Sequence, residues 1–195
     1  MQMITVSHGE TMLTTPDAAL ALQVLAGLSA SEKPAAAPSG IPAIGEYWPG
    51  EGGVNGGLFP GGDKPYYLIV PIGADAEKEL QWGGYGDELD GANSPNDGLA
   101  NTAELVGADD NYPAAQFCAA FERDGKKDFY LMARREAQFL EITVPDMFSK
   151  RWHWTSTQYS AYSAYRVGFG DGWLGLNVKD SERVVRPVRR ILITE

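Results

Sequence analysis

The chain has 195 residues, of which 44% are hydrophobic and 22% are charged, so a buried core is expected and global disorder is excluded. The net charge of −10 argues against sequence-independent nucleic-acid binding, because a polyanion repels an acidic surface. The single cysteine excludes an internal disulfide, and the absence of a run of about 18 apolar residues excludes membrane insertion.

Residues 1–40 differ in composition from the rest and are predicted to form an N-terminal arm and linker. Residues 3–6 have the pattern of a short strand. A helix is expected after Thr15, because Thr15 can cap it and Pro16 suits its first position. Its short apolar stripe fits either a helix packed on its own domain or an arm that docks onto a neighbouring subunit. No Lys or Arg precedes this stripe, so a secretory signal is not expected.

Residues 41–195 are predicted to form one loop-rich domain, consistent with 23 glycines and 12 prolines in the chain. The glycine run at 50–62 is interpreted as tight turns, and residues 66–72 as a buried strand. Residues 82–111 have little periodicity and are predicted to form a long irregular loop. Helices are expected at 113–123 and 134–140.

The last part of the domain alternates in the manner of an antiparallel sheet, with strands expected at 152–159, 164–169, 173–178 and 184–193. Gly170-Asp171-Gly172 predicts a tight hairpin turn, since glycine accepts a positive φ. The terminal strand is expected to pair near residues 66–72, and Trp154 is expected to be buried.

The residues with catalytic or ligating side chains are weighed against structural roles. His153 lies between two tryptophans, and a structural role in an aromatic strand is a simpler interpretation than that of a catalytic base. Cys118 falls on the apolar face of its helix, where a thiol is a small buried hydrophobe. The acidic stretches 87–93 and 109–111 offer oxygen ligands for calcium without the regular EF-hand spacing, so calcium stays open.

An aromatic tract mixed with small polar residues, 152–177, gives the main functional signal. Rigid aromatic rings provide contact area at low entropic cost, and small polar groups provide hydrogen bonds, which is typical of binding surfaces. The alternative is that half of these rings face the core. The residues predicted to project outward on or beside the final hairpin are Tyr159, Tyr162, Ser163, Tyr165, Asp171, Trp173, Asn177 and Lys179.

Three arginines, Arg186, Arg189 and Arg190, stand in the terminal strand of an otherwise acidic chain. They could form a cationic patch for an anionic receptor, or they could pair with acidic loops such as 87–90 or 104–110. The second interpretation is favoured, because an acidic protein offers many carboxylate partners.

Several stretches resemble one family. They are FYLMARREAQFL (129–140), WHWTSTQYS (152–160) and ERVVRPVRRI (182–191), supported by YWPGEGGVNGGL (47–58), WGGYG (82–86) and DGLANT (97–102). Together they are similar to the phage and prophage branch of the Lcl C-terminal-like domain family over about residues 41–192. The resemblance implies a C-type-lectin-like α+β fold with two helices, a small twisted antiparallel sheet, long loops and paired terminal strands.

The resemblance implies a non-enzymatic phage virion protein, most simply a receptor-binding or adhesin module of a tail or fibre. The partners implied are a host-surface protein or glycan, and other virion proteins bound through residues 1–40, in a homo-oligomer. A capsid decoration or fibre-attachment protein is the alternative. Formylglycine-generating enzymes of this fold use a cysteine pair, and this chain has one cysteine. No cofactor is expected apart from the open question of calcium.

Overall fold

The computed structural model describes residues 4–8, 11–15, 40–62, 64–109 and 111–193. The chain divides into two compact units, Met1–Gly40 and Ile41–Glu195. In the first, β1 (Ile4–His8) and β2 (Thr11–Thr15) form an antiparallel pair, so the strand predicted at 3–6 has a partner that the sequence analysis missed. The helix predicted after Thr15 and its linker up to residue 39 lie outside the described residues.

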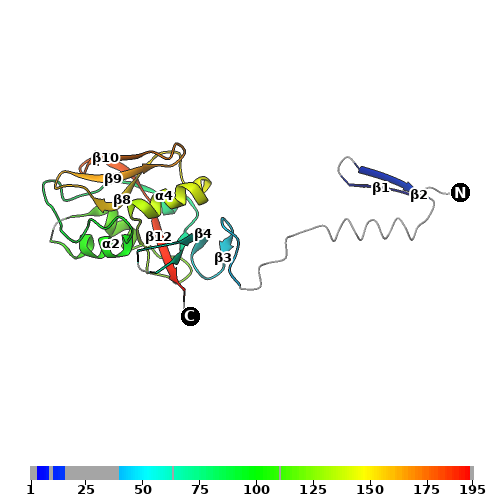
Figure 1. Ribbon diagram of the computed structural model, residues 1–195, viewed down its shortest axis with the longest axis horizontal. Helices are drawn as coiled ribbons and strands as arrows, with labels where there is room; N and C mark the ends of the chain where they lie inside the picture. Colours follow the sequence, from blue (N-terminus) through cyan, green and yellow to red (C-terminus); the bar gives the residue numbers. More distant parts are fainter. Residues whose placement is uncertain (1–3, 9–10, 16–39, 63, 110, 194–195) are drawn as a thin grey trace. The chain divides into compact units, whose positions relative to one another are not determined.

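The second unit is α+β and contains two five-stranded sheets (Figure 1). All neighbouring strands are antiparallel except β8 and β11, which are parallel. The first sheet has the order β10 (Leu174–Val178), β9 (Ser163–Gly168), β8 (Trp152–Gln158), β11 (Glu182–Val185) and β6 (Lys78–Gln81). The second has the order β3 (Tyr47–Trp48), β4 (Gly53–Phe59), β5 (Tyr66–Val70), β12 (Pro187–Leu192) and β7 (Tyr130–Leu131).

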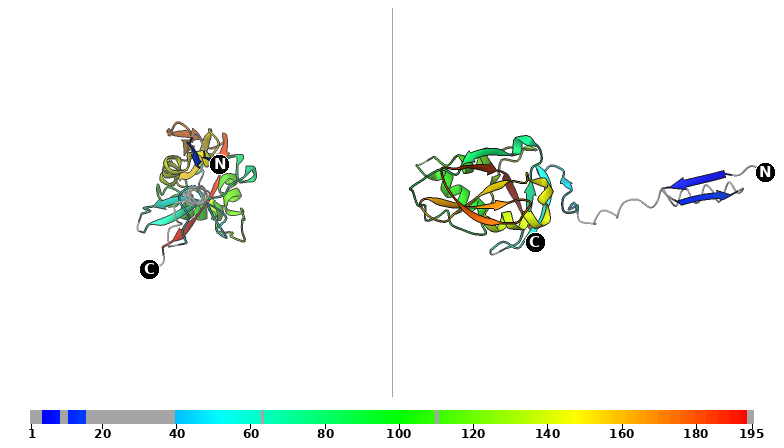
Figure 2. Two further views of the ribbon diagram at one scale, coloured as in Figure 1. Left: turned by 90° about the vertical axis from the view of Figure 1, so that its right-hand side faces the viewer. Right: turned by 90° about the horizontal axis from the view of Figure 1, so that it is seen from above.

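The described part of this unit has three α-helices: α2 (Gly98–Gly107), α3 (Pro113–Ala119) and α4 (Arg134–Thr143). Two short 3-10 turns, η1 (Ala74–Ala76) and η2 (Pro145–Met147), complete it. Helix α4 lies between β4 on one side and β8 and β9 on the other, so it packs against both sheets (Figures 1 and 2). Within the described residues, no helix has the length and apolar character needed to cross a membrane.

Residues 82–111 were predicted to form an irregular loop, but they contain helix α2. The described part of the domain therefore has three α-helices where the sequence predicted two. The Asp97 side chain caps α2 by accepting a hydrogen bond from Ala100 N at 3.0 Å. Gly98 begins the helix where space is short, because a Cβ there would lie 2.4 Å from the Glu136 carboxylate. The close packing against Glu136 therefore requires glycine at position 98. Glycines of this kind are typical of loops, which is why the sequence predicted a loop here.

The sheets also depart from the prediction of one small antiparallel sheet. The glycine-rich residues at 53–59 form β4, with a bulge between Asn55 and Gly57, instead of tight turns. The expected strand at 184–193 is two strands, β11 and β12, which belong to different sheets and are separated by Arg186. The predicted pairing of the terminal strand with residues 66–72 is confirmed, since β12 pairs with β5.

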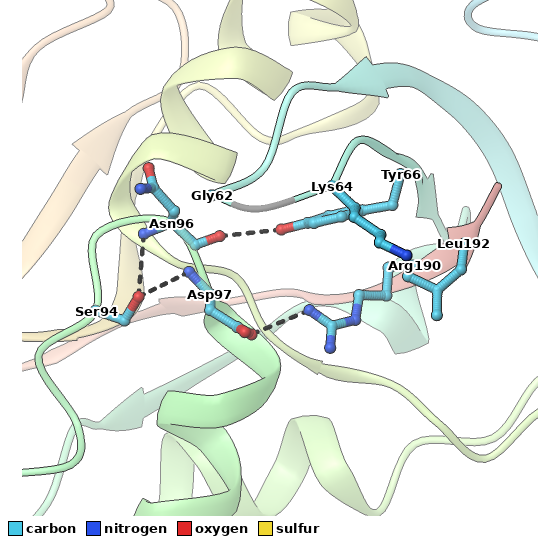
Figure 3. Close-up of a pocket in the computed structure, with 8 residues that line it drawn as sticks. All are labelled: Gly62, Lys64, Tyr66, Ser94, Asn96, Asp97, Arg190 and Leu192. Carbon is cyan, nitrogen blue, oxygen red and sulfur yellow. Dashed lines mark hydrogen bonds and ion pairs between the residues drawn. The ribbon is translucent and has the colours of Figure 1, made fainter.

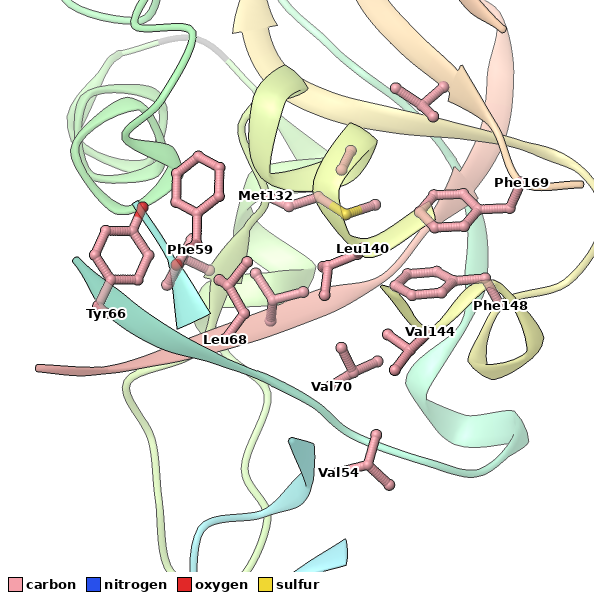
Figure 4. Close-up of a cluster of buried hydrophobic side chains, with 14 residues drawn as sticks. Val54, Phe59, Tyr66, Leu68, Val70, Met132, Leu140, Val144, Phe148 and Phe169 are labelled. Carbon is pink, nitrogen blue, oxygen red and sulfur yellow. The ribbon is translucent and has the colours of Figure 1, made fainter. Parts of the chain in front are cut away.

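Two buried clusters hold the second unit together. One gathers around α4, where Leu140 and Met132 contact the second sheet and Phe148 stacks on Phe169 with ring centroids 3.8 Å apart (Figure 4). The other surrounds Trp154 and Trp82 under α2 and α3. Trp154 is fully buried, as predicted, but His153 and Thr155 are buried as well, so β8 is covered on both faces and does not have one inner and one outer face.

The terminal arginines pair with acidic residues, but with different ones from those suggested by the sequence. Arg186 is buried at the break between β11 and β12. The observed pairs are Arg186 with Glu77 at 2.8 Å, Arg189 with Glu51 and Asp128 at 2.5 Å each, and Arg190 with Asp97 at 3.1 Å.

Candidate functional site

The predicted binding surface is divided between the two ends of the β9–β10 hairpin. Tyr162 directly precedes β9, whereas Trp173 follows the turn at its far end and directly precedes β10. A strand rises about 3.3 Å per residue, so the six residues of β9 hold these two side chains roughly 20 Å apart. The hairpin turn itself is confirmed, with positive φ at Gly170 and Gly172.

The predicted residues differ in exposure. Tyr159, Tyr162 and Trp173 are exposed at 58%, 56% and 69%. Asp171 is also exposed. Three others are partly buried: Ser163, Tyr165 and Asn177.

Lys179 is a correction, because its side chain is fully buried instead of projecting outward. Its Nζ donates to Asp87 O at 2.6 Å, to Gln158 Oε1 at 2.8 Å and to Gly84 O at 3.3 Å. The ammonium also lies 4.6 Å from the centroid of the Trp82 ring. Lys179 therefore ties the 84–87 loop to the end of β10, which is a positioning role.

Exposed tyrosines gather at the end of the hairpin that holds Tyr162. Tyr85, from the loop held by Lys179, meets Tyr162 edge to face with ring centroids 5.3 Å apart, and it is 56% exposed. Tyr159 meets Tyr165 at 5.6 Å, and the Arg134 guanidinium lies 4.7 Å from the Tyr165 ring. We call Tyr85, Tyr159 and Tyr162 the tyrosine surface; the sequence analysis did not include Tyr85.

Backbone hydrogen bonds fix the two loops that make up the tyrosine surface. Gly86 N donates to Ala161 O at 2.9 Å, which joins the 82–86 loop to the 159–162 loop. Lys179 N donates to Tyr162 O at 3.0 Å. Because the backbone of these loops is already ordered, binding costs less loop entropy, which favours affinity.

The opposite end of the hairpin presents Trp173 alone. Trp173 N donates to the Asp171 side chain at 3.2 Å, and Gly168 N donates to Trp173 O at 2.8 Å. The backbone is thus ordered while the indole is exposed. Among the residues that the structure describes, no other aromatic ring packs on Trp173, so it offers one ring instead of a cluster.

A pocket of about 370 Å³ lies between β5, β12 and the start of α2 (Figure 3). One of its cations, Arg190, is already paired with Asp97, and Ser94 Oγ accepts from Asp97 N at 3.0 Å. The Tyr66 hydroxyl lies 3.0 Å from Asn96 O. The remaining lining residues are Gly62, Lys64 and Leu192.

Glu136 lies next to this pocket and is fully buried. Its Oε1 accepts from the hydroxyls of Tyr66 at 2.6 Å and Tyr130 at 2.8 Å, and its Oε2 accepts from Ala133 N at 2.6 Å. Burial raises the pKa of Glu136 to about 7, because the charged form loses its water, and these hydrogen bonds only partly oppose that effect.

The other candidate residues have structural surroundings. His153 is buried with its Nε2 3.3 Å from Glu77, and its ring packs on Phe148 and Phe169. Cys118 is a free, buried thiol whose pKa is raised by burial. Among the described residues, which omit Asp110, no group of three or more His, Cys, Asp or Glu side chains is placed to hold a metal ion.

Comparisons with known proteins give no assignment. No protein-family model matches the chain, and no curated protein matches it significantly.

Proposed function

We propose that the protein is a non-enzymatic phage virion protein and that residues 41–195 form a C-type-lectin-like receptor-binding module of a tail or fibre. The observation that carries this proposal is the tyrosine surface, where Tyr85, Tyr159 and Tyr162 are each more than half exposed on ordered loops. The resemblance of residues 41–192 to the Lcl C-terminal-like family supports the same reading.

Exposed tyrosines suit a recognition role because their rings contribute large contact areas and their hydroxyls contribute hydrogen bonds to a host-surface protein or glycan. One such surface is small, so each copy binds weakly. In a homo-oligomer on a virion, several copies act together, and effective concentration multiplies the attachment strength.

The tyrosine surface gives a direct test. Virions that carry Tyr85→Ala with Tyr162→Ala should adsorb to host cells at least about 10-fold less well, a loss of about 1.4 kcal/mol. The melting temperature of the isolated protein should stay close to that of the wild type, because both rings are exposed.

Trp173→Ala is the matched control, since it removes an exposed ring at the other end of the hairpin. Normal adsorption of the control with impaired adsorption of the double variant supports the proposal. Normal adsorption of the double variant contradicts it. Impaired adsorption of the Trp173→Ala virion would move the contact to the 170–173 turn.

The alternative function, a decoration or fibre-attachment protein, is favoured by one observation. The β1–β2 hairpin belongs to a compact unit separate from residues 41–195, which suits attachment to a neighbouring virion protein. In both readings residues 1–40 fix the protein to the particle.

Deletion of residues 1–38 should therefore leave a folded domain that is absent from purified virions. The buried clusters are formed by residues from Val54 onward, so the truncated protein should retain its near-ultraviolet circular dichroism and a cooperative melt. Immunodetection in purified particles measures incorporation. An unfolded truncation, or normal incorporation, contradicts the assignment of residues 1–40 as the attachment segment.

A further inference from the structure

A hollow of about 510 Å³ in the first sheet region is strongly cationic. It is lined by Trp152, by one carboxylate, Glu79, and by four cations: Lys150, Arg151, Arg166 and Arg183. The chain as a whole carries a net charge of −10. A local excess of three positive charges therefore stands out against the acidic surface.

Two of the four cations are neutralised by neighbours. Arg151 pairs with Glu79, and Lys150 pairs with Asp146 at 3.1 Å. Asp171 lines the adjoining hollow next to Lys150 and Arg151. The two carboxylates that form ion pairs in this region are thus paired with Lys150 and Arg151.

Arg166 and Arg183 have no carboxylate partner in the part of the chain that the structure describes. The Arg166 guanidinium lies 4.1 Å from the Trp152 ring centroid, and Arg183 Nη1 donates to the backbone oxygen of Glu182 at 2.5 Å. The Nε atoms of both arginines are buried without a hydrogen-bond partner. Each guanidinium therefore lacks, among the described residues, both a carboxylate partner and a partner for its Nε.

The two guanidiniums also repel each other. Burial lowers the pKa of Arg166, and the positive charge of Arg183 lowers it further. Arginine remains protonated in proteins at neutral pH, so this repulsion persists in the unliganded protein. A bound anion would offset this repulsion.

We propose that Arg166 on β9 and Arg183 on β11 form a binding site for an oxyanion, either a phosphate or a carboxylate group of a ligand. Trp152, on the intervening strand β8, lines the same site. The planar, forked guanidinium fits both groups through paired N–H···O bonds. By contrast, Arg190 in the pocket of Figure 3 already has Asp97 as its anion. The oxyanion site shares no residue with the tyrosine surface and does not depend on the proposed function.

The test is a thermal melt of the full-length protein with inorganic phosphate, with glucuronate, or with sodium chloride at matched ionic strength. Phosphate, glucuronate or both should raise the melting temperature by about 2–4 °C beyond chloride, since a ligand that binds only the folded state stabilises it. The two arms distinguish a phosphate from a carboxylate as the group that is bound.

Arg183→Gln and Arg166→Gln should each abolish the anion-specific rise. Because either change relieves the repulsion, neither should lower the melting temperature without ligand by more than about 1 °C. Arg135→Gln removes the same charge from an exposed position on α4 and should keep the full rise.

The proposal is overturned if neither phosphate nor glucuronate exceeds chloride in the wild type. It is equally overturned if either arginine variant keeps the rise, or if Arg135→Gln loses it. To separate folding from binding, the shift of the Trp152 indole Nε1–H resonance can be followed during phosphate titration. That resonance should move in the wild type and in Arg135→Gln, and stay fixed in Arg183→Gln.

Discussion

Trp154→Ala should lower the free energy of unfolding of the domain by about 3–5 kcal/mol. The indole is fully buried in the cluster under α2 and α3, and its Nε1 donates to Leu80 O at 3.1 Å. Alanine would leave a cavity and an unpaired carbonyl, and both add to the lost burial of the ring.

Urea denaturation of residues 41–195 or of the full chain measures this loss. Trp173→Ala is the control, because its ring is 69% exposed and its removal should change the free energy of unfolding by about 0.5 kcal/mol or less. A loss below about 1 kcal/mol for Trp154→Ala would mean that the ring does not pack in the core.

Glu136→Gln should change how stability depends on pH. The pKa of Glu136 is raised to about 7 in the folded protein, whereas an unfolded glutamate titrates near 4.3. Below about pH 4 the group is protonated in both states. Between about 4 and 7 only the unfolded state releases the proton, so stability falls as pH rises, and the total loss above pH 7 is about 3 kcal/mol.

The local structure can accommodate the protonated form. The Tyr66 hydroxyl, which donates to Glu136 when the carboxyl is charged, lies 3.0 Å from Asn96 O and can donate there instead, leaving its oxygen to accept the proton of Glu136. The nearby charges are Asp97, which raises the pKa of Glu136, and Arg190, which lies 5.3 Å from the Tyr66 ring centroid.

Guanidine melts of the wild type and of Glu136→Gln, compared at pH values from about 4 to 8, test this prediction. The difference in unfolding free energy should move in favour of the variant by about 3 kcal/mol as pH rises across this range. Glu104→Gln, at an exposed position of α2, removes the same charge and should leave the wild-type slope. A parallel pH dependence of wild type and Glu136→Gln would show that folding does not raise the pKa of Glu136.

Local signals were sufficient for much of the fold. Strands β8 and β9, the Gly170-Asp171-Gly172 turn and helices α3 and α4 lie where short-range patterns predict them, but burial does not alternate along β8, which is covered on both faces. Helix α3 is shorter than predicted, ending at Ala119. The second sheet and the break at Arg186 are set by the strands with which each segment pairs. Those strands are far away in the sequence, so short-range patterns do not predict the pairing.

The candidate site shows the same limit. Tyr85 reaches Tyr162 only because the 82–86 loop is held against the end of β10, a contact between residues far apart in the sequence. Lys179 was assigned to the surface by residue type, whereas three oxygen atoms from distant segments satisfy its buried ammonium. The separation of Tyr162 from Trp173, however, could have been deduced from the predicted hairpin alone.

The crossing of residues 182–192 from one sheet to the other has a consequence for synthesis on the ribosome. β11 lies between β8 and β6, and β12 lies between β5 and β7, so this segment fills an inner position in both sheets. A nascent chain that has not yet reached residue 182 leaves the edges of these four strands open, and open edges invite pairing with other chains. Emergence of eleven consecutive residues then closes all four edges in one late, long-range step.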